Sequence, residues 1–334
     1  MLTAALWLSM AGSPCAAAGK DPDAVTVVDL RVGLASAFNQ PTANLWQGRG
    51  QGGIVQLHRG HVSGILIPFP PGLAAGSSTR LAVSFAHFRS ALGSTQAFDA
   101  RACGAGPARL GAWFQLDAPD VLAAEPAEVA TWVARGVRVF SLAGRRDSSL
   151  ATSAFPSGPE RVIGLTAAGQ QVASAILAEE ALIDVSNLSD VSIVDVLSLA
   201  RLAGKPVIAT RASARAVRAR PGSLTDWQLR SIAQSGGVVG LALDRDLIGD
   251  GDRAELSDVL RQVDHLTQVA SWDGVAIASG FETGALPPPA LGNAGRFPHL
   301  AAALEAHGVS QDQIRKLFSE NARRVLCGQD RGSH

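Results

Sequence analysis

The stretch ALIDVSNLSD, residues 181 to 190, contains the structural unit from which the fold can be worked out. Its first residues are mostly apolar and partly β-branched, which favours a strand. Ser186 and Asn187 then interrupt the run, and Ser189 or Asp190 is suited to cap a new helix. The stretch therefore predicts a strand that ends in a polar side chain, Asn187, and leads at once into a helix.

Seven further runs of this kind recur along the chain. They cover residues 24 to 32, 61 to 69, 111 to 117, 137 to 144, 206 to 211, 237 to 243 and 274 to 281. Most are almost continuously apolar, as parallel strands are when helices cover both faces. Helical patterns are expected at residues 166 to 180, 190 to 201, 225 to 234, 254 to 270, 297 to 307 and 311 to 326.

Alternating strands and helices predict an α/β protein, a (β/α)8 barrel of the TIM type. An open, doubly wound sheet is the alternative. It is disfavoured because no glycine-rich phosphate-binding turn follows the first strand.

The charge balance and the amino-terminal segment restrict the partners and the location. With 29 basic and 29 acidic residues, the chain has no overall field to attract nucleic acid or an anionic membrane. No later apolar run is long enough for a transmembrane helix. Residues 1 to 18 are apolar and end in small residues, so we expect a signal peptide there, a single barrel domain over residues 19 to 334, and export to the periplasm or medium.

The three cysteines bear on lipid anchoring and on disulfide formation. Cys15 lies in a poor lipidation motif, so a lipid anchor is not expected. Export would allow Cys103 and Cys327 to form a disulfide. Because they are far apart in the sequence, we expect them to be independent of each other.

The carboxyl ends of the strands are the functional face of a barrel. The residues at these ends are Arg31, Gly33, Asp117, Gly144, Asn187, Arg211 and Gly280. A hydrolytic metal centre needs His, Asp, Glu or Cys at such positions. This set contains one carboxylate and two guanidiniums, and a guanidinium has no lone pair to donate to a metal.

From about Val25 to Leu326 the chain resembles the membrane dipeptidase (renal dipeptidase-like) family of zinc metallopeptidases. The segments that carry the resemblance include GHVSGILIPFP (60 to 70), ARGVRVFSLAG (134 to 144), GLTAAGQQVASAILAEEALIDVSNLSD (164 to 190), PVIATRASARAV (206 to 217) and QVDHLTQVASWDGVAIASGFETG (262 to 284). The resemblance implies a barrel of the metal-dependent hydrolase type. It also implies two zinc ions that activate water to hydrolyse a dipeptide.

The chain departs from the family at the residues that perform this chemistry. The positions that match the family's zinc ligands are Arg31, Gly33, Asp117, Asn187 and Arg211. Gly280 matches the family's acid/base residue, and Gly144 and Gly222 match its substrate contacts. Among the ligand positions only Asp117 keeps a carboxylate, where the family has a glutamate.

We therefore predict a pseudoenzyme with no catalytic residues, no metal and no other cofactor, and with a binding or scaffold role in the cell envelope. One alternative is an active dipeptidase or hydrolase with a single-metal or metal-independent site that uses Asp117 and Glu282. Another is a non-catalytic partner subunit of an active paralogue. The resemblance also implies a homodimer, since members of the family tend to form dimers.

Charged side chains remain at the carboxyl ends of the strands, which form the mouth of the barrel, and they suggest a ligand. If Arg31 and Arg211 lie opposite Asp117, a surplus of positive charge would suit a small anionic or peptide-like ligand. In the alternative that we favour, one arginine pairs with Asp117, the other reaches solvent, and nothing binds.

Other residues have structural interpretations. Glu282 is expected to be a solvated loop residue. Asp264 and His265 are expected to point apart on their helix and to serve packing or to lie at the surface. Asp184 is expected to bond to neighbouring backbone or to Arg211, and Trp227 to fill the core.

Overall fold

A computed structural model of the chain describes residues 25–35, 50–69, 78–94, 98–99, 103, 109–123, 125–155 and 163–328. The expected signal peptide over residues 1 to 18 and Cys15 lie outside these ranges. No helix within them is long and apolar enough to cross a membrane.

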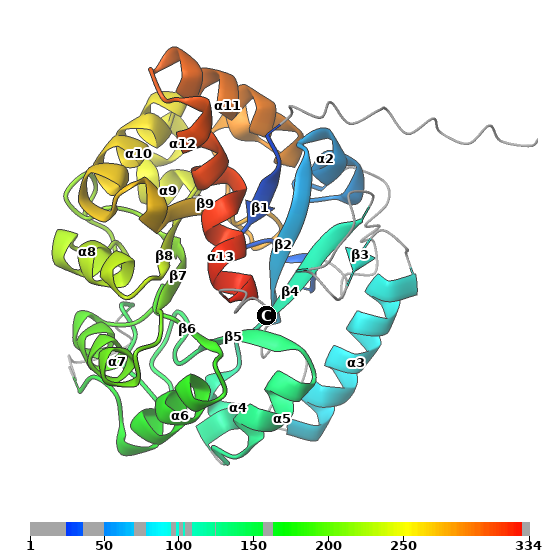
Figure 1. Cartoon of the computed structure of the whole chain (residues 1–334), viewed down its shortest axis with the longest axis vertical. Helices are drawn as coiled ribbons and strands as arrows, with labels where there is room; N and C mark the ends of the chain where they lie inside the picture. The colour runs from blue at the N-terminus through cyan, green and yellow to red at the C-terminus, as the bar shows by residue number, and fades with distance from the viewer. Residues whose placement is uncertain are drawn as a thin grey trace, which may run out of the picture.

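Eight parallel strands follow one another around a barrel in chain order (Figure 1). They are β1 (Val27–Asp29), β2 (Val62–Phe69), β4 (Leu110–Leu116), β5 (Val137–Ser141), β6 (Leu182–Asp184), β7 (Ile208–Ala212), β8 (Val238–Ala242) and β9 (Val275–Ala278). Hydrogen bonds from Leu30 N to Ile277 O (2.9 Å) and from Gly280 N to Arg31 O (3.0 Å) join β1 to β9. This ring confirms the predicted barrel and excludes the open sheet. A short strand that was not predicted, β3 (Phe98–Asp99), pairs with β4 off the ring.

Helices surround the ring (Figure 1). They are α2 (Ile54–Arg59), α3 (Ser78–Ser94), α4 (Pro119–Ala123), α5 (Glu128–Ala134), α6 (Ala167–Ala178), α7 (Asp190–Ala203), α8 (Asp226–Gln234), α9 (Arg245–Ile248), α10 (Leu256–Ala270), α11 (Phe297–Ala306), α12 (Gln311–Arg315) and α13 (Asn321–Cys327). Short 3-10 turns lie at η3 (Gly251–Arg253), η4 (Trp272–Gly274), η5 (Pro289–Leu291) and η6 (Ala294–Arg296). The helices predicted at α6, α7, α8, α10 and α11 are confirmed. Where one last helix was predicted, a π-helical turn, η7 (Lys316–Glu320), joins α12 to α13.

The start of α7 follows the capping pattern of the opening stretch. Ser189, rather than Asp190, is the N-cap, and its Oγ accepts a hydrogen bond from Ser192 N at 3.2 Å. This bond satisfies one of the free amide groups of the first helical turn. The helix therefore begins at Asp190, three residues after Asn187.

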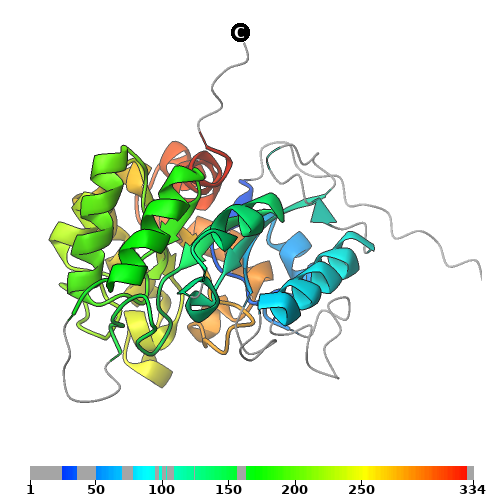
Figure 2. The same cartoon turned by 90° about the horizontal axis from the view of Figure 1, so that it is seen from below.

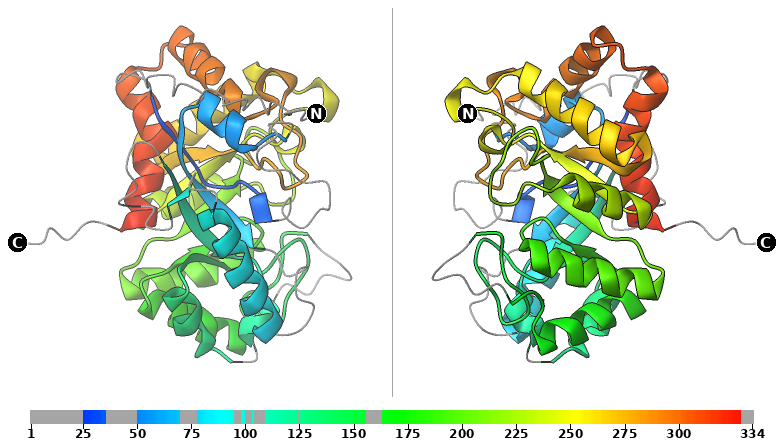
Figure 3. Two further views of the ribbon diagram at one scale, coloured as in Figure 1. Left: turned by 90° about the vertical axis from the view of Figure 1, so that its right-hand side faces the viewer. Right: turned by 90° about the vertical axis from the view of Figure 1, so that its left-hand side faces the viewer.

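The barrel has an inner and an outer apolar layer. The inner layer consists of Val28, Leu30, Leu66, Trp113, Val139, Leu182, Ile208, Val238, Ala276 and Ala278, with Ala322, Val325 and Leu326 of α13. Helix α13 therefore closes one end of the barrel, opposite the loop after β9 (Figures 2 and 3). The larger outer layer packs the strands against the surrounding helices. Trp227, which was expected in the core, is 51% exposed on α8.

Cys103 and Cys327 form a disulfide with their Cα atoms 5.6 Å apart. The expectation that they are independent is therefore wrong. Their separation of 224 residues in sequence is no obstacle, because the fold brings the end of α13 next to the segment before β4. The disulfide links α13, which closes the barrel, to Cys103 in the segment before β4.

Loss of this disulfide is expected to lower the free energy of unfolding by about 2–4 kcal/mol, because the unfolded chain regains freedom that the cross-link removes. Urea unfolding with and without dithiothreitol measures the loss. Cys327→Ala serves as the control, since its stability should not respond to the reductant. Equal unfolding midpoints of the natural protein in both conditions would show that the bond contributes nothing.

Candidate functional site

The polar side chains of the barrel mouth come from alternate positions of the strands. On β4, Trp113 belongs to the inner apolar layer, and Gln115 and Asp117 follow at the next alternate positions. On β6, Asp184 follows Leu182 in the same way. Because side chains alternate across a strand, these residues all face the inside of the ring. The inside is therefore apolar near α13 and polar at the carboxyl ends of the strands.

Asp184 is the centre of a buried hydrogen-bond network. Its Oδ1 accepts from Thr210 N (2.9 Å), Ser186 N (3.1 Å) and Ser186 Oγ (2.5 Å). Its Oδ2 accepts from Thr210 Oγ1 (2.6 Å) and from Gln115 Nε2 (2.7 Å). The expected bonds from Asp184 to neighbouring backbone are confirmed. The cation beside it is Arg31, at 3.9 Å, rather than Arg211.

Arg31 bridges two carboxylates at the mouth. Its Nη1 donates to Thr210 Oγ1 (3.1 Å) and lies 3.9 Å from Asp184 Oδ2. Its Nη2 donates to Asp117 Oδ2 at 3.4 Å. Burial raises the pKa of Asp117, and the charge of Arg31 opposes that rise. The Arg31 side chain is only 11% exposed, so these contacts are shielded from solvent.

Arg211 faces a different acid. Its Nη2 pairs with Oδ2 of Asp244, which lies after β8 and also caps α9 through Asp246 N (3.1 Å). Burial lowers the pKa of Arg211. Both expectations for this arginine are wrong, because it lies neither opposite Asp117 nor out in solvent. Asp244 was missed because its position before a short helix indicates only a cap.

These pairs also change the expected charge of the site. Arg31 and Arg211 contact Asp117, Asp184 and Asp244, so the two guanidiniums are already matched by carboxylates. With Asp117 alone, the two arginines would have left a surplus of positive charge. Because three aspartates contact them, no such surplus remains around these two arginines. Anion binding by Arg31, Arg211 and Asp117 stays a prediction.

The other positions that match the family's site have backbone roles here. At Gly33 an added Cβ would lie 2.5 Å from the carbonyl oxygen of Glu282, so a side chain has no room there. Gly280 adopts a φ of 74°, which favours glycine, and donates to the Arg31 carbonyl. The carbonyl of Asn187 accepts from Ala154 N at 2.8 Å and so holds the loop after β5.

Asp29 is a buried acid that sequence reasoning missed, although it interrupts the apolar run AVTVVDLRV. Its Oδ1 accepts from Ser279 N (2.9 Å) and from Arg31 N (3.1 Å). Among the described residues its Oδ2 has no hydrogen-bond partner. Burial raises the pKa of Asp29 to about 6. Asp29 therefore positions the backbone of Arg31 where β1 meets β9.

Asp29→Asn is expected to remove part of the pH dependence of stability. A carboxyl whose pKa is higher in the folded than in the unfolded protein loses stability as the pH rises through that interval. A shift from 3.8 to about 6 corresponds to roughly 3 kcal/mol. In urea unfolding between about pH 4 and 7, the free energy of unfolding of the variant should therefore rise relative to that of the natural protein as the pH rises. If the free energy of unfolding of the two proteins changed with pH in the same way, Asp29 would not have a raised pKa in the folded protein.

Glu282, Asp264 and His265 have structural contacts. The Glu282 carboxylate accepts from Gly52 N at 2.8 Å, so the residue ties the loop after β9 to the segment before α2 rather than lying free in solvent. His265 Nε2 lies 2.8 Å from Asp226 Oδ1, whereas Asp264 pairs with His307 at 3.0 Å. Asp264 and His265 therefore point apart, as expected, and Asp264 lies at the surface.

The donors at the mouth do not fit a pair of zinc ions. Within the ranges that the structure describes, no group of three or more His, Cys, Asp or Glu residues is placed to hold a metal ion. Beside Asp117 and Asp184 the neighbouring charged group is the guanidinium of Arg31, which has no lone pair for a metal.

The closed ring of parallel strands with helices around it defines a (β/α)8 barrel of the TIM type. Comparison with known families narrows this class. The chain belongs to the membrane dipeptidase family (peptidase family M19), whose model matches residues 79–331.

Two individual relatives are similar to parts of the chain. An uncharacterized protein in the pqqA 5' region of Klebsiella pneumoniae is 34% identical over 210 residues, which cover 60% of this chain and 76% of that protein. The dipeptidase ataJ of Aspergillus terreus is 30% identical over 148 residues, which cover 43% of this chain but only 35% of ataJ.

A solved structure supports the fold. The metallopeptidase of Rhodobacter sphaeroides, crystallised with a phosphinate mimic of the dipeptide L-Ala-D-Ala, superposes with a TM-score of 0.79. The match covers 90% of this chain and 98% of that one, at 23% identity. At this level of identity the likeness concerns the fold alone.

Proposed function

We propose that the chain is a catalytically inactive member of its family, with a binding or scaffold role in the cell envelope. The observation that carries the proposal is the position of Arg31. Its guanidinium lies 3.4 Å from Asp117 and 3.9 Å from Asp184, at a strand end where the family resemblance places a zinc ligand.

Arg31 replaces the charge of a metal but not its chemistry. A cation between two buried carboxylates compensates their repulsion. A zinc ion would in addition accept lone pairs, lower the pKa of bound water and polarise a carbonyl oxygen. Arginine stays protonated and provides none of these effects.

Among the residues that the structure describes, those around Arg31 provide no substitute for the missing catalytic groups. Gly280, at the position that matches the family's acid/base, has no side chain to move a proton. Glu282, the other acid considered for this role, is occupied with the amide of Gly52. The carboxylate of Asp184 is already surrounded by donors from Thr210, Ser186 and Gln115.

Hydrolysis of L-Ala-D-Ala, measured by release of alanine with and without added zinc, tests this proposal. We expect no turnover above that of a matched Asp117→Ala variant. Zinc-dependent turnover that Asp117→Ala abolishes would instead support an active enzyme with an altered site. Co-purification with an active family member from the native host, without intrinsic turnover, would support the partner-subunit alternative.

The ligand and the location are also proposals. A small anion at Arg31 and Arg211 is tested by thermal-shift measurements with acetate, phosphate and dipeptides. A shift in the melting temperature that Arg211→Ala removes would support binding at the mouth. Cleavage of residues 1 to 18 and recovery of the chain from the periplasm would support the envelope location.

A further inference from the structure

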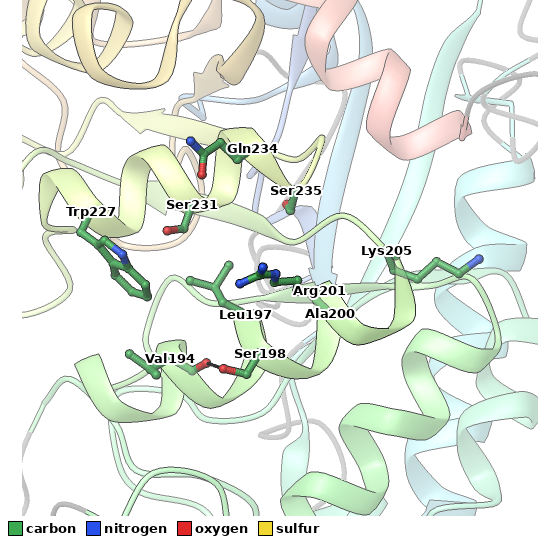
Figure 4. A pocket seen from close by; sticks show the side chains of 11 residues that line it. Val194, Leu197, Ser198, Ala200, Arg201, Lys205, Trp227, Ser231, Gln234 and Ser235 are labelled. Atoms are coloured by element: carbon green, nitrogen blue, oxygen red, sulfur yellow. Dashed lines mark hydrogen bonds between the residues drawn. The ribbon is translucent and has the colours of Figure 1, made fainter.

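A groove outside the barrel runs between α7 and α8 (Figure 4). It has a volume of about 660 Å³, within the range of roughly 300–1,000 Å³ that is typical of small-molecule sites. Its lining combines apolar, hydroxyl, amide and basic side chains and contains no carboxylate. Helices α7 and α8, which form the walls of the groove, both pack on the outer layer of the core.

The apolar part of the groove is formed by Trp227, Val194 and Leu197. Trp227 is 51% exposed and extends from α8 toward Val194 on α7, which is 42% exposed (Figure 4). Leu197 is nearly buried beneath them. An exposed indole beside exposed aliphatic groups offers a flat apolar surface that an aromatic ring covers with a gain in free energy.

The basic part is formed by Arg201 and Lys205, further along α7. Lys205 Nζ pairs with Glu180 at 2.8 Å, so its charge is already matched. Arg201 is exposed, and its guanidinium forms no ion pair or hydrogen bond with the residues that the structure describes. The lining of the groove therefore offers the guanidinium of Arg201 for a ligand, one helical turn from Leu197, which lies between Arg201 and Trp227 (Figure 4).

We propose that this groove binds a small aromatic carboxylate or sulfonate, with the ring against Trp227 and the acidic group paired with Arg201. A flat ring fits the exposed indole, and a planar guanidinium pairs with an oxyanion through two parallel hydrogen bonds. The site is independent of the barrel mouth, so it does not depend on whether the chain is a pseudoenzyme.

The probe for this site is 8-anilinonaphthalene-1-sulfonate, whose fluorescence rises in an apolar environment. We expect saturable binding to the folded protein, and Trp227→Ala and Arg201→Glu should each weaken it by about tenfold or more. Arg230→Glu is the matched control, because Arg230 is an exposed arginine on α8 outside the lining of the groove. It should change the affinity by less than about twofold.

A second dye, N-phenyl-1-naphthylamine, has the same rings without the sulfonate. It should bind more weakly than the sulfonate, and Arg201→Glu should leave its affinity unchanged, whereas Trp227→Ala should still reduce it. Thermal unfolding of each variant checks that the fold is intact. Absence of saturable sulfonate binding, or equal affinities of the natural protein, Trp227→Ala and Arg201→Glu, would overturn the proposal. So would a loss of stability in Arg201→Glu without a change in dye affinity, since Arg201 would then only stabilise the end of α7.

Discussion

Replacement of Asp184 by alanine is expected to lower the free energy of unfolding by about 4 kcal/mol, near the upper limit for a single substitution. The carboxylate accepts five hydrogen bonds, two of them from the backbone amides of Thr210 and Ser186. Alanine leaves these donors buried without acceptors, and each such group is destabilising by about 1–3 kcal/mol before relaxation. Arg31 also loses one of its two carboxylate neighbours.

Urea unfolding at pH 7 measures this effect. Asp264→Ala is the matched control, because Asp264 is an exposed carboxylate whose one partner among the described residues is His307 at the surface. Its loss should stay below about 1 kcal/mol. If Asp184→Ala were as mild as Asp264→Ala, the network would not hold the barrel mouth together.

Arg31→Met is expected to lower the free energy of unfolding by about 3–5 kcal/mol at pH 7, because Asp117 and Asp184 then share the mouth without their cation. The loss should shrink toward pH 5. Burial already raises the pKa of Asp117, and removal of Arg31 raises it further above the unfolded value. Such a carboxyl destabilises the fold when it ionises, so protonation at lower pH restores stability.

The comparison is the difference in unfolding free energy between Arg31→Met and the natural protein at pH 7 and at pH 5. Arg145→Met is the control, since Arg145 is an exposed arginine of the mouth that stacks on Phe155, 4.4 Å from the ring centre. Arg145→Met should change the free energy of unfolding only slightly, and by the same amount at pH 7 and pH 5. A loss for Arg31→Met that is below about 1 kcal/mol and equal at both pH values would contradict the bridging role.

The barrel was predictable from the sequence because its strands are local signals. A continuous apolar run such as HVSGILIPF at β2 shows by itself that both faces are covered. Helix α3 also carried a local signal that was not used, since Leu81, Phe85, Phe88 and Leu92 are spaced for one buried face. The π-helical turn at η7 leaves no comparable mark in the sequence.

The site was only half predictable. Strand ends converge in any barrel, so the positions of Arg31, Asp117 and Arg211 followed from the fold. Their partners did not, because a guanidinium selects among carboxylates that only the folded chain brings within reach. Asp244 follows β8, which lies beside the strand of Arg211, and which acid each arginine meets depends on the directions of the side chains.

The expectations for Trp227 and for the cysteines were wrong for a similar reason, because both depend on the tertiary arrangement of the chain. An aromatic residue at the start of a helix packs inward or outward according to the turn on which it falls, and Trp227 faces the groove instead of the outer core. Two cysteines 224 residues apart meet because α13 returns to close the barrel.

The most direct test of the central claim is the zinc content of the purified protein after incubation with excess zinc and dialysis, measured by plasma mass spectrometry. If Arg31 occupies the place of the metal, the protein should retain well under one zinc ion per chain, and Asp117→Ala should retain the same amount. One or two zinc ions per chain that Asp117→Ala removes would contradict the account.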